Sequence, residues 1–285
     1  MIRIVILAAA IVPALLFLIY GIRKAGVDWR SEAVWSAFFL GAVGLFGALG
    51  VELAVGQLGF LGGSFPILGS ASKAVFVAAI PEETIKFFVL VVLAEKNVDV
   101  RRFQDVIVLG LAVSLGFATL ENFFYVIAGG DWRITAALRA VTSVPGHGLD
   151  GLAMGALLVS ARLDGIKGHG IKEIWAARSA LLIPVLLHAA YDFPLFVLKH
   201  GIAARWFAAA WLMVIAISSI FVVRLFNRVL ARAAFADLTS PHDAASKEDV
   251  KRLMGSGAIG LIGGRLLQPQ SDVPSEPMRA LPHQS

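Results

Sequence analysis

The sequence predicts an all-α fold: a polytopic membrane bundle of about seven transmembrane helices, followed by a disordered C-terminal tail. Hydrophobic residues make up 58% of the 285 residues and charged residues only 16%, whereas soluble domains have about 45–50% and roughly a quarter. The mean hydropathy is +0.79, and successive apolar stretches are each long enough to cross a bilayer. This composition excludes a soluble enzyme and a nucleic-acid-binding domain.

Seven apolar stretches are predicted to span the membrane, because about twenty apolar residues cross its hydrocarbon core. They are 4–22, 34–54, 74–94, 105–128, 136–160, 179–198 and 206–227. The first stretch exceeds the ~7–15 apolar residues of a signal peptide and ends in Arg23 and Lys24, so we expect a retained helix. The apolar, Gly-rich stretch from Val55 to Ser72 is a candidate re-entrant or interfacial loop.

The basic residues between and beside these spans are distributed unevenly. Thirteen follow the first, third, fifth and seventh spans, and six, Arg139 among them, lie on the other side. Because cytoplasmic loops carry the excess of Lys and Arg, the N-terminus is expected outside and the C-terminus in the cytoplasm. Residues 1–232 form the predicted transmembrane domain. Residues 233–285 are predicted to be a mostly disordered cytoplasmic tail.

Ionisable side chains inside spans are costly and mark a functional site by default. Four consecutive spans carry polar residues: Glu82, Glu83 and Lys86; Glu121 and Asn122; His147 and Asp150; His188 and Asp192. At ~1.5 Å per residue, the first acidic or imidazole group of each span lies roughly 10–17 Å below the outer surface. The shared level predicts one polar chamber in the outer half of the bilayer.

The chemistry that this set supports is metal-assisted hydrolysis. Two imidazoles and a carboxylate from separate helices make a three-ligand catalytic zinc site, and a neighbouring glutamate would be the general base. The chain has no cysteine, so any metal ligand is His, Asp or Glu. Asp192 lies four residues after His188 and either orients its imidazole or joins it as a ligand.

Each of these signals has an alternative interpretation. Glu82 and Glu83 can form a structural ion pair with Lys86, and a membrane histidine can simply bond to a neighbouring helix. Asp150 and Glu52 are expected at supporting or boundary positions. Chains of carboxylates and imidazoles also serve proton relays, so a proton- or cation-coupled transporter, or a catalytically silent scaffold, is the alternative function.

The motifs occur in a fixed order on successive spans. They are Glu82-Glu83-x-x-Lys86, Phe117-x-x-x-Glu121-Asn122, His147-x-x-x-Gly151 and His188-x-x-x-Asp192. This set resembles the PrsW family of bacterial intramembrane proteases. It is more distantly similar to the CAAX-processing and bacteriocin-processing membrane endopeptidases. The resemblance covers about residues 70–200.

The resemblance implies a peptidase of the bacterial plasma membrane, surrounded by lipid, that cuts a single-pass membrane protein near its extracytoplasmic side. An anti-sigma factor is the expected kind of substrate. The functional positions implied are Glu82, Glu83, Glu121, His147 and His188. Glu82 is expected to be the base, and Glu121, His147 and His188 to hold Zn²⁺. Lys86, Glu83, Asn122 and Asp192 are expected to support them, and a metal-free glutamate mechanism is the alternative.

Overall fold

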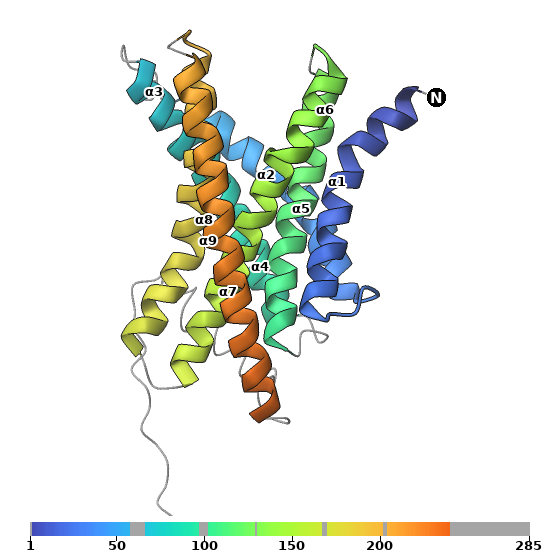
Figure 1. Cartoon of the computed structure of the whole chain (residues 1–285), viewed down its shortest axis with the longest axis vertical. Helices are drawn as coiled ribbons and strands as arrows, with labels where there is room; N and C mark the ends of the chain where they lie inside the picture. Colours follow the sequence, from blue (N-terminus) through green and yellow to red (C-terminus); the bar gives the residue numbers. More distant parts are fainter. Residues whose placement is uncertain are drawn as a thin grey trace, which may run out of the picture.

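The computed structural model describes residues 2–57, 66–96, 102–128, 130–166, 170–201 and 204–239. Within these ranges the secondary structure is helical, as predicted (Figure 1). The elements are α1 (Ile2–Ala25), α2 (Glu32–Gly56), α3 (Pro66–Ser72), the π-helical segment η2 (Lys73–Ala79), α4 (Ile80–Lys96), α5 (Phe103–Ala128), α6 (Trp132–Val141), α7 (Ser143–Ile166), α8 (Gly170–Leu198) and α9 (Ala204–Thr239).

These elements make seven helical rods in the described ranges, one for each predicted span. The segments α3, η2 and α4 follow one another without a gap, and α6 joins α7 at Thr142, whose backbone leaves the helical region (φ −125°, ψ −69°). Five helices, α1, α2, α5, α8 and α9, contain stretches long and apolar enough to cross a membrane. The protein is thus an integral membrane protein. The rods of α4 and α7 carry several of the polar site residues instead.

Several boundaries differ from those predicted, and α8 begins at Gly170, nine residues before the predicted start at 179. Pro66 begins α3, as proline does well in a first helical turn, so part of the expected loop is helical, while 58–65 lie outside the described residues. The fifth rod starts at Trp132, where Asp131 caps α6 by accepting a hydrogen bond from the Arg133 amide. The last helix continues to Thr239 through an alanine-rich segment, and 240–285 are not described.

Helix α5 is the centre of the bundle. In its apolar stretch 83% of the residues are buried, against 11% in that of α9. Small residues let its neighbours approach closely: a Cβ at Gly116 would overlap the Phe38 carbonyl of α2, and one at Gly151 of α7 would overlap the Gly110 carbonyl of α5. Such small-residue contacts are typical of packed membrane helices. They fix the helices that carry Glu121 and His147.

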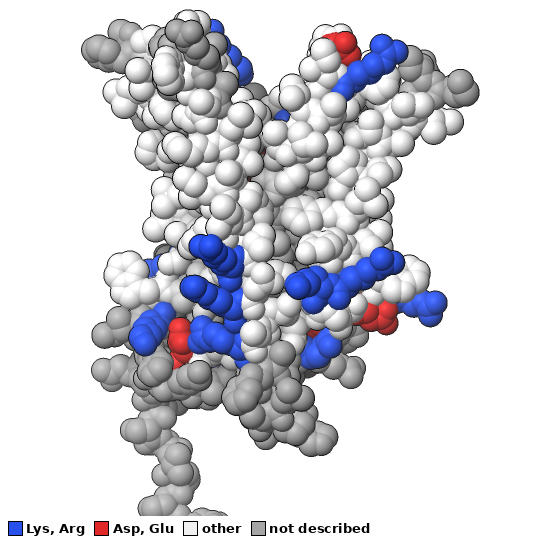
Figure 2. Space-filling model, in the orientation of Figure 1, with Lys and Arg blue, Asp and Glu red and all other residues white. Residues whose placement is uncertain are grey.

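The two ends of the bundle differ in shape and charge. At the upper end of Figure 1, α3 diverges from α6, and the first turns of α9 lie on the α3 side. On the face drawn in Figure 2, most Lys and Arg side chains gather toward the opposite end, below a broad uncharged zone. Arg23 and Lys24, in the last turn of α1, belong to the chain segments at that end. The asymmetry agrees with the charge distribution along the sequence.

Candidate active site

Two adjacent glutamates lie in the first turn of α4. The π-helical segment η2 precedes that turn, and Pro81, which has no amide hydrogen, lies within it. Lys86 follows one turn later, and its ammonium donates to Glu82 Oε2 at 3.1 Å and to Glu83 Oε1 at 2.8 Å. Its Nζ also lies 4.1 Å from the centre of the Phe117 ring. The first motif therefore forms a buried ion-pair cluster.

His147 of α7 joins this cluster through one ring nitrogen. Its Nδ1 lies 3.0 Å from Lys86 Nζ, and its Nε2 lies 2.9 Å from Glu121 Oε2 of α5. An ammonium group can only donate, so Nδ1 accepts from Lys86. The proton of the neutral ring is then on Nε2 and is donated to Glu121. The contacts thus define which nitrogen faces the glutamates of α4.

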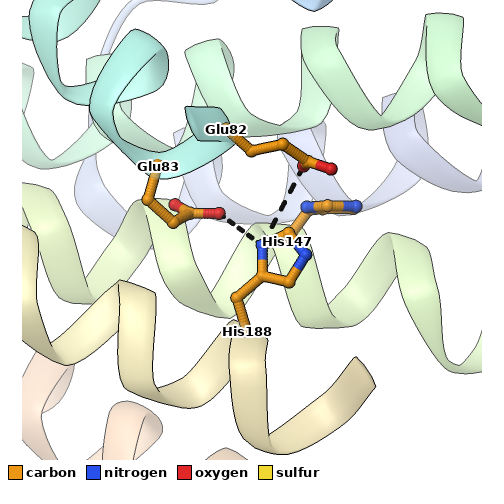
Figure 3. A group of neighbouring side chains, drawn as sticks. All are labelled: Glu82, Glu83, His147 and His188. Atoms are coloured by element: carbon orange, nitrogen blue, oxygen red, sulfur yellow. Dashed lines mark hydrogen bonds and ion pairs between the residues drawn. The ribbon is translucent and has the colours of Figure 1, made fainter. Parts of the chain in front are cut away.

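His188 of α8 approaches from the other side, as Figure 3 shows. Its Nδ1 lies 2.7 Å from Glu83 Oε1 and 3.9 Å from Glu82 Oε2, while its Nε2 lies 3.5 Å from Asp192 Oδ2. The two imidazole rings are 5.3 Å apart, centre to centre, and nearly perpendicular. Both rings direct Nδ1 inward and Nε2 toward an outer carboxylate.

Four side chains from three helices could hold a metal ion together. One ligand atom each of Glu82, Glu83, His147 and His188 lies within 4.8 Å of the others, and all four residues are buried. The donor set fits a divalent cation in two ways. Three of its members, Glu82, Glu83 and His147, already contact one cation, the Lys86 ammonium, and the Glu83 Oε2 atom is buried without a hydrogen-bond partner. Two imidazoles with carboxylates suit zinc.

Glu121 lies outside this group of four. Its carboxylate accepts from His147 and forms an ion pair with Arg139 of α6. Asn122 also lies outside the group of four: its Nδ2 donates to the Ala10 carbonyl of α1 at 2.9 Å, and its Oδ1 accepts from Arg139 Nε at 2.9 Å. The expected role of Glu121 as a metal ligand stays a prediction. The structure brings it to the outer nitrogen of His147.

A cavity of about 570 Å³ opens beside the cluster. Glu82, His147 and His188 line it and Glu83 does not, and Glu52 and Asp150 add further carboxylates to its wall. Residues from α2, η2, α4, α5, α6, α7, α8 and α9 contribute to the lining. Its size lies within the usual range of ligand pockets. A short segment of another chain would have direct access to Glu82.

Sequence analysis gave no role in the site to Arg139, which lines the cavity. It was counted as a charge that sets topology, although it falls inside the predicted span 136–160. A charged residue inside a span was the signal that could have found it. The hydroxyl of Tyr191, which donates to Thr142 Oγ1 at 3.0 Å across the cavity wall, carried no comparable signal.

Comparison with known proteins agrees with this geometry. Residues 30–239 match the profile of the PrsW family of intramembrane metalloproteases. Protease PrsW of Bacillus subtilis (strain 168) is 35% identical over 198 residues, which cover 69% of this chain and 85% of that protein. The chain belongs to the PrsW family. It is accordingly a membrane-embedded peptidase, and its substrate is a protein.

Further PrsW proteins show the same relationship. Protease PrsW of Halalkalibacterium halodurans is 35% identical over 190 residues, covering 66% of this chain and 81% of the relative. Protease PrsW of Clostridioides difficile (strain 630) is 30% identical over 123 residues, covering 42% and 50%. No solved structure matches the chain significantly. The profile match begins after α1, so the first helix lies outside the region that defines the PrsW family here.

Proposed function

We propose that this PrsW-family protein hydrolyses a peptide bond of a single-pass membrane protein near the extracytoplasmic face, with water activated at a metal site. The observation that carries the proposal is the convergence of Glu82, Glu83, His147 and His188 beside an open cavity. Carboxylates and imidazoles from three helices, all buried, are costly in a membrane unless they perform chemistry. An anti-sigma factor is the substrate type that the family resemblance suggests.

The role of each residue is assigned by whether its side chain lines the cavity. His147 Nδ1, His188 Nδ1 and Glu83 would hold a zinc ion, since Glu83 is fully buried, bonds to His188 and does not line the cavity. Glu121 and Asp192, at the outer nitrogens, would orient the two rings. This assignment replaces Glu121 by Glu83 as the third ligand. Zinc would polarise the scissile carbonyl and lower the pKa of a water molecule.

Glu82 is the general base in this proposal because it borders both the cluster and the cavity. Its carboxylate takes a proton from the attacking water as the water oxygen bonds to the carbonyl carbon. The same proton then passes to the amide nitrogen as the C–N bond breaks, which leaves a carboxyl terminus and an amine. Lys86, 3.1 Å from Glu82, places a positive charge beside this carboxylate, and that charge favours the ionised form that accepts the proton.

The extracytoplasmic location rests on the position of the cluster along its helices. Glu121 lies seven residues before α5 ends at Ala128, and His188 lies ten residues before α8 ends at Leu198. Both helix ends are opposite the end where basic side chains gather in Figure 2. If that basic end faces the cytoplasm, the cluster lies in the outer half of the membrane.

The direct test compares two glutamate variants in cells. Glu82→Gln is expected to abolish cleavage of the membrane substrate, a loss of about 10²–10⁴-fold for a missing general base, while the purified protein keeps its zinc. The matched control is Glu32→Gln, at an exposed position of α2. The readout is the membrane proteome, searched for a single-pass protein that is shortened only with wild type and control. Normal cleavage by Glu82→Gln would disprove the proposed base.

The orientation can be tested cleanly because the chain has no cysteine. His200→Cys, just after α8, is expected to react with a membrane-impermeant maleimide in intact cells. Asp28→Cys, between α1 and α2, is expected to react only after the cells are permeabilised. The reverse labelling pattern would put the cluster on the cytoplasmic side and contradict this part of the proposal.

A further inference from the structure

We propose that Arg139 of α6 is a positioning residue of the peptidase: it holds Glu121, and through Glu121 it fixes the imidazole of His147 with Nδ1 toward the catalytic glutamates. The inference rests on the proposed function, in which His147 Nδ1 is a metal ligand. It assigns a role to a residue whose charge would otherwise only contribute to membrane orientation.

The Arg139 guanidinium is held at three points by one face of α5. Its Nε donates to Asn122 Oδ1 at 2.9 Å, its Nη2 donates to Glu121 Oε2, and its planar group lies 4.1 Å from the centre of the Tyr125 ring. The side chain is only 15% exposed. A mobile surface arginine does not make such a set of contacts, and the forked, planar geometry is particular to arginine.

One oxygen atom transmits this arrangement to the site. Glu121 Oε2 accepts both from Arg139 Nη2 and from His147 Nε2. In the described part of the chain, Arg139 is the only Arg or Lys paired with Glu121. Without it a largely buried carboxylate would lose its counter-ion, and losing one partner of such a pair is costly. The carboxylate would then turn toward the cavity and release Nε2 of His147.

The freed ring has an alternative position to adopt. Lys86 Nζ donates to His147 Nδ1, at 3.0 Å, only while the ring proton is on Nε2 and is donated to Glu121. Once Nε2 is unpaired, the proton can move to Nδ1 or the ring can rotate, and either change removes the inward lone pair. Partners that orient a ligating histidine in this way typically contribute 10–100-fold to metal affinity or activity. Glu121 is the orienting partner here, and Arg139 holds Glu121 by a further hydrogen bond.

Helix α6 provides a matched control. Arg133 lies on the same helix and also stacks on an aromatic ring, that of Trp132 at 5.3 Å, but it is exposed and does not border the cavity. The variants are therefore Arg139→Lys, Arg139→Met and Arg133→Lys, each in the full chain purified in detergent. All values are expressed per folded molecule after size-exclusion chromatography, so that a loss of folded protein does not count as a loss of function.

Three readouts are measured. In ¹⁵N-histidine spectra, with the His147 signal assigned by its absence in His147→Ala, wild type and Arg133→Lys should show the Nε2-protonated tautomer, and both Arg139 variants a mixture or the other tautomer. Zinc affinity, measured with Zn²⁺ and a competing chelator, should fall about 10–100-fold in the Arg139 variants. The kcat for cleavage should fall with it, and KM should stay unchanged.

A double-mutant cycle tests the route. In the Glu121→Gln background, Arg139→Lys should add little to the loss, because both changes remove the same support for His147. The proposal is overturned if the Arg139 variants match Arg133→Lys in tautomer and zinc affinity, or if the effects of Arg139→Lys and Glu121→Gln multiply. If wild type cleaves no membrane protein, the proposed function fails, whereas the tautomer comparison still decides the role of Arg139.

Discussion

The two imidazoles of the site are held in different ways. The His147 arm, which consists of Glu121, Arg139 and Asn122, runs from a 2.9 Å bond at Nε2 through two further side chains to the backbone of α1. The His188 arm is Asp192 alone, on the same helix, 3.5 Å from Nε2 and 18% exposed at its side chain. That separation exceeds the usual hydrogen-bond distance.

For the two proposed metal ligands, this difference indicates one ring that is held rigidly and one that is adjustable at its outer nitrogen. His147 is fixed by residues from three other helices, α1, α5 and α6, so its position follows from how the bundle packs. His188 is held at Nδ1 by Glu83 of α4, at 2.7 Å, but the partner of its Nε2 is Asp192 of its own helix, so the outer side of this ring depends less on how the helices pack.

The largest expected effect is the same for both arms. His147→Ala and His188→Ala should each abolish zinc binding and cleavage, because each removes an inward nitrogen that three-ligand zinc sites cannot spare. Metal content of the purified proteins is the measurement, with about one zinc per chain expected for wild type. His200→Ala, at an exposed position beyond α8, is the control. Full zinc occupancy in either site variant would mean that its ring is not a ligand.

The arms should separate when their outer carboxylates are changed. Glu121→Gln is expected to lower zinc affinity and kcat about 10–100-fold, as loss of an orienting partner does. Asp192→Asn should lower them by less, since its contact with His188 is long and partly exposed. Chelator competition and initial cleavage rates measure both. Equal losses would remove the distinction between a rigid and an adjustable ligand, and a complete loss of zinc in Glu121→Gln would favour Glu121 as a ligand after all.

The smallest expected effect comes from the close contact between α2 and α5, the helix that carries Glu121 and Asn122. Gly116→Ala introduces a Cβ that overlaps the Phe38 carbonyl, and overpacking of this kind costs about 1–3 kcal/mol. It should lower the melting temperature and, by moving α5, weaken zinc binding slightly. Gly50→Ala, in open space on α2, is the matched helical control and should be neutral or stabilising. A melting temperature unchanged by Gly116→Ala would contradict the close α2–α5 contact.

The seven-rod fold and the approach of polar residues from four spans could be predicted because each has a recognisable sequence pattern. Span length is visible in the apolar runs, and a charge or imidazole inside a run is rare enough to indicate a site. Counting residues from the ends of the spans gives Glu82, Glu121, His147 and His188 a common level. A common level does not distinguish contact with the cluster from contact with its outer edge.

The finer arrangement depends on features that have no local signature. Whether Glu121 meets the inner or the outer nitrogen of His147 is decided by the crossing of α5 and α7, which follows from contacts such as Gly110 with Gly151. The break at Thr142 ends α6 and lets this short helix pack Arg139 against α5. Pro145 lies three residues later and has no amide hydrogen for the carbonyl of Val141. Without that break, an arginine near the membrane surface is indistinguishable from one that only sets orientation.

The hydrogen bond from Asn122 to the Ala10 carbonyl has a practical consequence for work on PrsW proteins. Ala10 lies upstream of the segment, residues 30–239, by which this chain is assigned to its family. A truncation to that segment would keep all four sequence motifs and would still delete the Ala10 carbonyl that holds Asn122, a partner of Arg139. Such a shortened enzyme is expected to lose activity, because α1 also contributes Leu18 and Ile22 to the buried core, and restoring the first helix should recover it.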